Sequence, residues 1–220
     1  MSKVVPNKPL LILLYGYPGA GKTYFARQLC NHLQAAHVHG DRIRGELFEQ
    51  PRYDKEENDV IAQLMDYMTG EFLNAGLSVI YDTNAMRVGQ RRMLRELGRK
   101  LRAHPLLIWL QIDTESSFAR AAGRDRRRAD DKFAGPSDHA TLERLAGAMQ
   151  NPQNEEYIVI SGKHTFETQL SAFMKRLREL GLVPNSTEAS TKVVKPGLVN
   201  LIPSPAAGRV DMNRRNIMIR

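Results

Sequence analysis

The chain has 220 residues, of which 42% are hydrophobic and 25% are charged, so it can bury one domain and is not disordered throughout. Its apolar runs are too short to cross a bilayer or to form a signal-peptide core, and its one cysteine cannot make an internal disulfide, so we expect a cytoplasmic protein with no membrane partner. The net charge of +8 is concentrated partly in 87–102 and 187–220, which makes nucleic acid a candidate partner.

Apolar runs alternate with amphipathic stretches along the first 180 residues. The expected strands lie at 10–15, around residue 38, and at 78–81, 105–112 and 157–160. The expected helices lie at 22–35, 42–74 with a break near Pro51, 88–101, 114–124 capped by Thr114, 138–149 and 165–180. Strand and helix repeated in this order predict an α/β fold, with a parallel five-stranded sheet flanked by helices and the apolar run 10–15 as a central strand.

The composition changes after Leu182. Prolines at 184, 196, 203 and 205 interrupt a stretch rich in Ser, Thr, Gly and Val, which lacks an apolar period. We therefore expect one domain over 8–182 and an extended or disordered C-terminal tail over 183–220.

One segment matches the phosphate-binding pattern G-x-x-x-x-G-K-[ST] in full and lies between the first expected strand and helix. Its residues are Gly16, Tyr17, Pro18, Gly19, Ala20, Gly21, Lys22 and Thr23. The glycines let the backbone curl so that successive N–H groups point at phosphate oxygens. Lys22 adds a charge for the β- and γ-phosphates, Thr23 offers a hydroxyl to Mg²⁺, and the helix N-terminus favours the same anion. The segment predicts a P-loop NTPase fold that binds ATP or GTP, and the lack of an N-K-x-D-type guanine reader disfavours a signalling GTPase.

Three further segments carry residues suited to phosphoryl transfer: Asp-Arg-Ile-Arg at 41–44, Val-Ile-Tyr-Asp-Thr-Asn at 79–84, and an arginine-rich stretch before Pro136. With them, residues 10–180 resemble the small P-loop kinases that include phage-type polynucleotide 5′-kinase, zeta-toxin kinases and chloramphenicol phosphotransferase. The resemblance implies that the protein transfers the γ-phosphoryl group of ATP to a hydroxyl-bearing acceptor under an arginine-rich lid.

Asp41 stands where this family has the carboxylate that activates the acceptor. Independently, a carboxylate at the carboxyl end of a strand beside the P-loop faces the region where open α/β sheets bind ligands, and it could accept the proton of a hydroxyl. The alternative is that Asp41 only caps the following helix. One turn later, Arg44 resembles the family arginine that holds an acidic acceptor group; the alternative is an ordinary solvated arginine.

Asp82 follows a hydrophobic strand, as the Walker B carboxylate does, and could hold Mg²⁺ directly or through water. In the polynucleotide-kinase branch the equivalent Asp-Thr-Asn shapes the acceptor site instead, so both roles stay open for Asp82, and Asn84 is an acceptor-site candidate. A turn-forming aspartate is the third reading of Asp82.

Arg120 and Arg124 have the i, i+4 spacing found at the lid edge in this family, where arginines fold over the phosphates and neutralise charge in the transition state. The alternative is a solvated basic loop. Arg124 is the catalytic candidate, with Arg120 and Arg126 as further nucleotide-binding candidates.

Two other patterns bear on function. His37 and His39 alternate along a short strand, but no third ligand with metal spacing accompanies them, so the sequence disfavours a metal site there. Val88, Arg92, Arg95 and Arg99 form one strip of a helix, which could follow nucleic-acid phosphates.

The residues therefore predict a Mg²⁺- and ATP-dependent kinase. The rivals are a polynucleotide 5′-hydroxyl kinase and, from another class, a regulatory ATPase that transfers nothing.

Overall fold

The computed structural model of the protein describes residues 3–125, 132–135 and 138–184. All of these belong to one compact unit, Met1–Pro184. Most of the expected tail, residues 185–220, lies outside the described residues, and so does the lid candidate Arg126.

A five-stranded parallel sheet forms the centre of this unit, in the order β2-β3-β1-β4-β5. The strands are β1 (Leu10–Tyr15), β2 (Ala35–His39), β3 (Ser78–Asn84), β4 (His104–Gln111) and β5 (Ile158–Ser161). Every residue of β1 is buried, because a central parallel strand is covered on both faces and can be apolar at every position. The expected α/β fold is confirmed.

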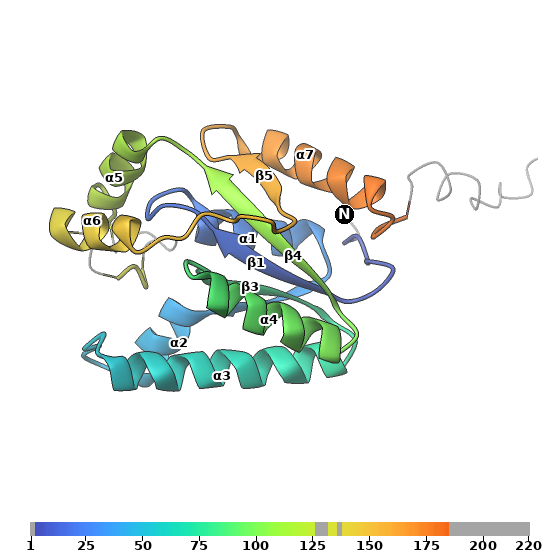
Figure 1. The fold of residues 1–220 in the computed structure, drawn as a ribbon, viewed down its shortest axis with the longest axis horizontal. Coiled ribbons are helices and arrows are strands. Elements are labelled where there is room, and N and C mark those ends of the chain that lie inside the picture. Colours follow the sequence, from blue (N-terminus) through green and yellow to red (C-terminus); the bar gives the residue numbers. More distant parts are fainter. Residues whose placement is uncertain (1–2, 126–131, 136–137, 185–220) are drawn as a thin grey trace, which may run out of the picture. The chain divides into compact units, whose positions relative to one another are not determined.

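Seven helices surround the sheet in the described residues. They are α1 (Lys22–His32), α2 (Gly40–Leu47), α3 (Lys55–Asn74), α4 (Val88–Lys100), α5 (Thr114–Ala122), α6 (His139–Gly147) and α7 (Phe166–Glu179). Figure 1 shows α3 and α4 on one side of the sheet, α7 on the other, and α5 and α6 beyond the ends to which the strand arrows point.

The domain has two apolar cores, and successive side chains of β1 contribute alternately to one and to the other. Leu10, Ile12 and Leu14 pack in one cluster with side chains of α1 and α7. Leu11 and Leu13 pack in the other with side chains of α3 and α4. Because successive side chains of a strand point to opposite faces, this one segment joins both layers and carries the P-loop at its carboxyl end.

Two local expectations need correction. The N-cap of α5 is Asp113, whose side chain accepts a hydrogen bond from Ser116 N, and Thr114 is the first helical residue. Val183, assigned to the tail from sequence, is buried and belongs to the core cluster of α1 and α7. The chain turns after α7 through Gly181 with φ of 65°, and this turn brings Leu182 and Val183 back onto the core.

Candidate active site

The P-loop connects β1 to α1 and has the backbone geometry of a phosphate cradle. Gly19 has φ of 89°, and a Cβ there would lie 2.0 Å from the Ser117 carbonyl oxygen of α5. A Cβ on Gly16 would lie 2.5 Å from the Leu110 carbonyl oxygen of β4. Side chains are therefore excluded at both positions by neighbouring backbone as well as by conformation, and the Ser117 hydroxyl donates to the Pro18 carbonyl at 2.6 Å, so α5 rests directly on the loop.

The N-terminus of α1 has neither a side-chain cap among the described residues nor an acid in its first turn, and its N-cap is Gly21. By contrast, the N-caps of α3, α5 and α6 are aspartates, and the side chain of each accepts a hydrogen bond from a backbone N–H: Asp54, Asp113 and Asp138. The first N–H groups of α1 and its positive dipole end are thus available to an anion.

Lys22 lies over the loop that it follows. Its Nζ donates to the carbonyls of Gly16 at 2.8 Å and Tyr17 at 2.9 Å. Burial lowers the pKa of Lys22 to about 8, and Arg124 adds to this, while the charges of Asp82 and Asp41 act in the opposite sense. A partly desolvated cation beside an open helix N-terminus is suited to polyphosphate.

Asp82 is buried, and its Oδ1 accepts from the Thr23 hydroxyl at 3.3 Å. A carboxylate and a hydroxyl are the hard oxygen ligands that Mg²⁺ takes alongside phosphate and water, so this pair fits a magnesium ion. Asn84 points elsewhere, since its Oδ1 accepts from Gly16 N at 3.4 Å. A break in register between β1 and β3, after Leu13, separates these two side chains.

Asp41 is at the start of α2, yet it is not the cap of that helix. The N-cap is His39, and no side chain among the described residues caps it. Partial desolvation raises the pKa of Asp41 and the charge of Asp82 does the same, whereas His39, Arg44 and Arg124 lower it. Arg124 acts on the pKa values of both Asp41 and Lys22, so the structure brings a carboxylate, a lysine and an arginine into one electrostatic neighbourhood.

Arg44 does not fit the expected role of an acceptor-binding residue, nor is it solvated. It is buried in an ion pair with Glu57, donates to Asn58 Oδ1 at 2.6 Å and lies over the Tyr53 ring at 4.6 Å. A buried guanidinium needs such partners, and its charge therefore serves to join α2 to α3.

Of the other two lid candidates, only Arg120 is among the described residues. Arg120 Nη1 donates to the Gly162 carbonyl at 2.7 Å, which ties α5 to the turn after β5. Arg126 lies outside the described residues. Of the three arginines, Arg124 alone is described beside Lys22 and Asp41.

A family described as an AAA domain, AAA_33, matches residues 11–152, which is more than half of the chain. The chain belongs to this family. The match covers the P-loop, Asp41, Asp82, Asn84 and Arg124, and it ends before β5 and α7.

Two curated relatives of this AAA-domain protein are 25% identical to it. One is named a probable bifunctional SAT/APS kinase 2 of Sorangium cellulosum; the similarity covers 77% of this chain and 28% of the relative, so the chain spans little more than a quarter of that protein. The other is named a probable adenylyl-sulfate kinase of Pyrococcus abyssi; here 79% of this chain and 97% of the relative are covered.

Solved structures share the fold at lower identity. Kti12 of Chaetomium thermophilum, in complex with ADP-AlF3, has a TM-score of 0.58 and 17% identity, covering 77% of this chain and 98% of that one. The APS kinase of Mycobacterium tuberculosis, in complex with AMPPNP and APS, has a TM-score of 0.56 and 14% identity, covering 79% and 99%. Family and fold make this AAA-domain protein P-loop kinase-like; the polynucleotide-kinase and zeta-toxin branch stays a prediction.

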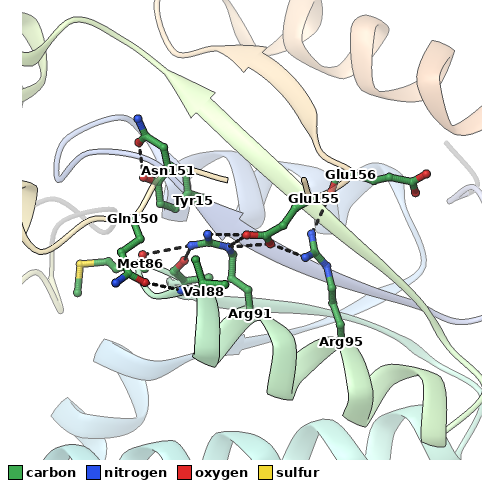
Figure 2. Close-up of polar contacts among 10 residues, drawn as sticks. Tyr15, Met86, Val88, Arg91, Arg95, Gln150, Asn151, Glu155 and Glu156 are labelled. Carbon is green, nitrogen blue, oxygen red and sulfur yellow. Dashed lines mark hydrogen bonds and ion pairs between the residues drawn. The ribbon is translucent and has the colours of Figure 1, made fainter. Parts of the chain in front are cut away.

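The arginine strip of α4 is only partly open to a ligand, because one of its members, Arg95, is paired with Glu155 (Figure 2). Arg95 is bound by Glu155 and donates to the Glu156 carbonyl at 3.0 Å, so it does not follow phosphates as the strip predicted. Arg92 and Arg99 remain exposed, and they line a groove of about 380 Å³ together with the paired Arg95, Val88 and 153–155. The nucleic-acid reading thus rests on two arginines of the AAA-domain protein.

Two features were missed by sequence reasoning. Arg91, next to that strip, is fully buried and holds Glu155, and nothing in the helix pattern separated it from its exposed neighbours. The sequence offered no third metal ligand beside His37 and His39, but strand pairing places Asp82 there.

None of the described helices is long and apolar enough to cross a membrane.

Proposed function

We propose that the protein transfers the γ-phosphoryl group of ATP to a hydroxyl group of an acceptor, with Mg²⁺ as cofactor. ATP is supported by the nucleotide analogues bound to the similar structures and by the cradle at 16–23, in which backbone N–H groups and Lys22 suit the β- and γ-phosphates. Thr23 and Asp82 would hold Mg²⁺, which when bound neutralises charge on the phosphates.

The observation that carries the proposal is the second carboxylate. Asp41 does not cap its helix, and partial desolvation together with the charge of Asp82 raises its pKa against the opposing charges of His39 and two arginines. An elevated pKa favours proton acceptance from a hydroxyl group near neutral pH. Arg124 lies within electrostatic range of Lys22 and would stabilise charge that develops during transfer. A carboxylate of this kind can also activate water, so transfer of labelled phosphate to an acceptor is what separates this proposal from the regulatory-ATPase alternative.

The proposal leaves two candidates for the acceptor that receives the phosphoryl group. Adenylyl sulfate is one candidate, because both curated relatives carry APS kinase names. A polynucleotide 5′-hydroxyl is the second, and the exposed Arg92 and Arg99 beside their groove favour it. Asn84 contacts the P-loop backbone, so in either case it would connect the acceptor side of the site to the cradle.

The test is transfer of labelled γ-phosphate from ATP to a panel of acceptors: adenylyl sulfate, gluconate and other sugars, nucleosides, aminoglycosides, and RNA or DNA 5′-hydroxyl ends. Asp41→Asn should leave ATP binding near normal and lower transfer by roughly 10²–10⁴, the contribution of a general base. Asp59→Asn is the matched control, since Asp59 is an exposed aspartate on α3. Lys22→Ala should remove transfer and hydrolysis together.

Two outcomes would reject the proposal. If ATP is hydrolysed while no acceptor of the panel is labelled, the ATPase alternative is the better description. If Asp41→Asn costs no more than Asp59→Asn, Asp41 is not the proton acceptor.

A further inference from the structure

Strand pairing gathers three metal-ligating side chains at the carboxyl ends of β2 and β3. His39 pairs with Asp82 in the parallel ladder. His37 lies two residues earlier on β2, so it shares the face of the sheet to which His39 points. The two imidazole rings are stacked in parallel, with centroids 5.3 Å apart and an interplanar angle of 2°.

The ligand atoms are close enough to share one ion. Asp82 Oδ2 lies 2.8 Å from His37 Nε2 and 3.8 Å from His39 Nε2, and the three atoms all lie within 4.8 Å of one another. Ligands bound to zinc at about 2.0–2.1 Å in a tetrahedron are roughly 3.3 Å apart. The observed separations bracket that value, so small side-chain rotations would complete the site.

The two oxygens of Asp82 face different partners. Oδ1 lies toward the Thr23 hydroxyl, and Oδ2 lies toward the two histidines. The hydroxyl side suits magnesium, which prefers oxygen ligands. The histidine side offers two nitrogens and one oxygen, a ligand set that suits Zn²⁺, Co²⁺ and other transition metals rather than Mg²⁺.

The site is reachable from outside. A cavity of about 150 Å³ is lined by Thr23, His37, His39 and Phe133, together with Tyr24 and two cationic side chains, Arg27 and Arg42. The side chains of His37 and His39 are 21% and 12% exposed, and that of Asp82 is 3% exposed. Since a water molecule occupies about 30 Å³ of liquid, the cavity has room for an ion and for a non-protein ligand that completes its coordination.

We propose that His37 Nε2, His39 Nε2 and Asp82 Oδ2 form a binding site for a divalent transition-metal ion of the Zn²⁺ type. The ion would clamp the carboxyl ends of β2 and β3 beside the P-loop. This site goes beyond the proposed phosphoryl transfer, which needs only the oxygen side of Asp82.

Cobalt is the probe, because a Co²⁺ ion with four or five ligands absorbs visible light far more strongly than the hydrated ion. The full chain, freed of metal by chelation, is titrated with Co²⁺ in the absence of nucleotide and Mg²⁺. We expect one Co²⁺ per chain with an intense visible band, which Zn²⁺ abolishes by displacement and a large excess of Mg²⁺ leaves unchanged. No band, or a band removed by Mg²⁺, would overturn the proposal.

Histidine variants locate the ion. His37→Gln and His39→Gln should each weaken Co²⁺ binding at least about tenfold, since loss of even an outer-shell partner costs that much, and the double variant should lose the band. His139→Gln is the matched control, because His139 also lies beside a carboxylate, Glu143, but both are exposed and belong to no group of three possible ligands in the described part of the chain. A band that survives the double variant would show that the ion binds elsewhere.

A measurement on the unaltered chain keeps the test decisive if a variant does not fold. X-ray absorption of the zinc-loaded protein should show two imidazole ligands, and fewer than two would refute the site. Because metal binding is measured without nucleotide, its failure leaves the γ-phosphate assay unaffected. Failure of phosphoryl transfer likewise leaves the cobalt result standing.

Discussion

Glu155→Ala tests the buried ion pair that joins α4 to the segment before β5 (Figure 2). Glu155 Oε1 lies 2.7 Å from Arg91 Nη2, with side-chain exposures of 9% and 0%. Arg91 Nη1 also donates to the carbonyls of Ala85 at 2.8 Å and Met86 at 3.1 Å. These two residues follow β3 and the Asp82–Asn84 segment, so the pair supports one wall of the candidate active site.

Removing the carboxylate leaves a guanidinium with no exposure and no counter-charge of its own. Breaking a buried pair in this way costs about 3–5 kcal/mol. Arg91 keeps its two carbonyl acceptors and its position 5.2 Å from the Tyr15 ring, so we expect the lower end, about 3 kcal/mol. In a domain of this size each kcal/mol moves the melting temperature by about 2–4 °C, which gives a fall of roughly 6–12 °C.

The assay is equilibrium unfolding in urea, with thermal melting as a second probe. Glu179→Ala is the matched control, because Glu179 pairs with Arg176 at a similar 2.9 Å but with side chains 45% and 50% exposed. An exposed pair contributes at most about 1 kcal/mol. If Glu155→Ala costs no more than Glu179→Ala, the burial argument is refuted.

The same pair predicts a pH dependence of the free energy of unfolding. Burial alone would raise the pKa of Glu155, but the hydrogen bonds and charges of Arg91 and Arg95 outweigh it and hold the pKa below its ordinary value of 4.5. A carboxylate with a lowered pKa stabilises the fold above that ordinary value, and its contribution is lost as the pH falls through the folded-state pKa. The stability difference between wild type and Glu155→Gln should therefore shrink in acid.

Three further predictions concern the cradle, the domain boundary and the groove of α4. The affinity for ATP, measured at constant salt, should fall as the pH rises through about 8, because Lys22 with its pKa of about 8 then loses its charge; equal affinities on both sides of that pH would contradict this. Truncation after Pro184 should leave the melting temperature unchanged, whereas truncation after Leu182 should lower it, because it removes the buried Val183, worth at most about 1.5–3 kcal/mol; equal melting of the two would place the boundary earlier. Single-stranded oligonucleotides should bind at low salt and weaken roughly sevenfold from about 50 to 200 mM salt, since two phosphate contacts give a slope of about −1.4; binding that survives Arg92→Glu with Arg99→Glu would exclude this groove.

Short-range pattern predicted much of the fold and the centre of the candidate site. The run 10–15, the glycine-rich loop and the helix from Lys22 are adjacent in the chain, so their chemistry could be read without knowing what packs against them. Asp41 and Asp82 were identified because each follows a strand, and parallel strands present their carboxyl ends at one edge. The parallel five-stranded sheet followed from the alternation of strand and helix.

The partners of individual charges depended on contacts between distant segments. Arg44 was expected at the acceptor and is instead buried against Glu57, and Arg91 differs from Arg92 only in the direction it points from α4. Burial and pairing of a long side chain depend on which element covers it, and the helix period does not specify that element.

The histidine cluster shows the same division. The alternation of His37 and His39 was visible in the sequence, but Asp82 lies 43 residues after His39 and joins them only through the register of β2 against β3. Register depends on packing across the whole sheet, and a shift of one residue would turn these side chains to opposite faces. The sequence by itself therefore determined the phosphate-binding loop and the strand ends that flank it, whereas only the tertiary structure decided which side chains meet there, because those meetings arise from pairing and packing between segments far apart in the chain.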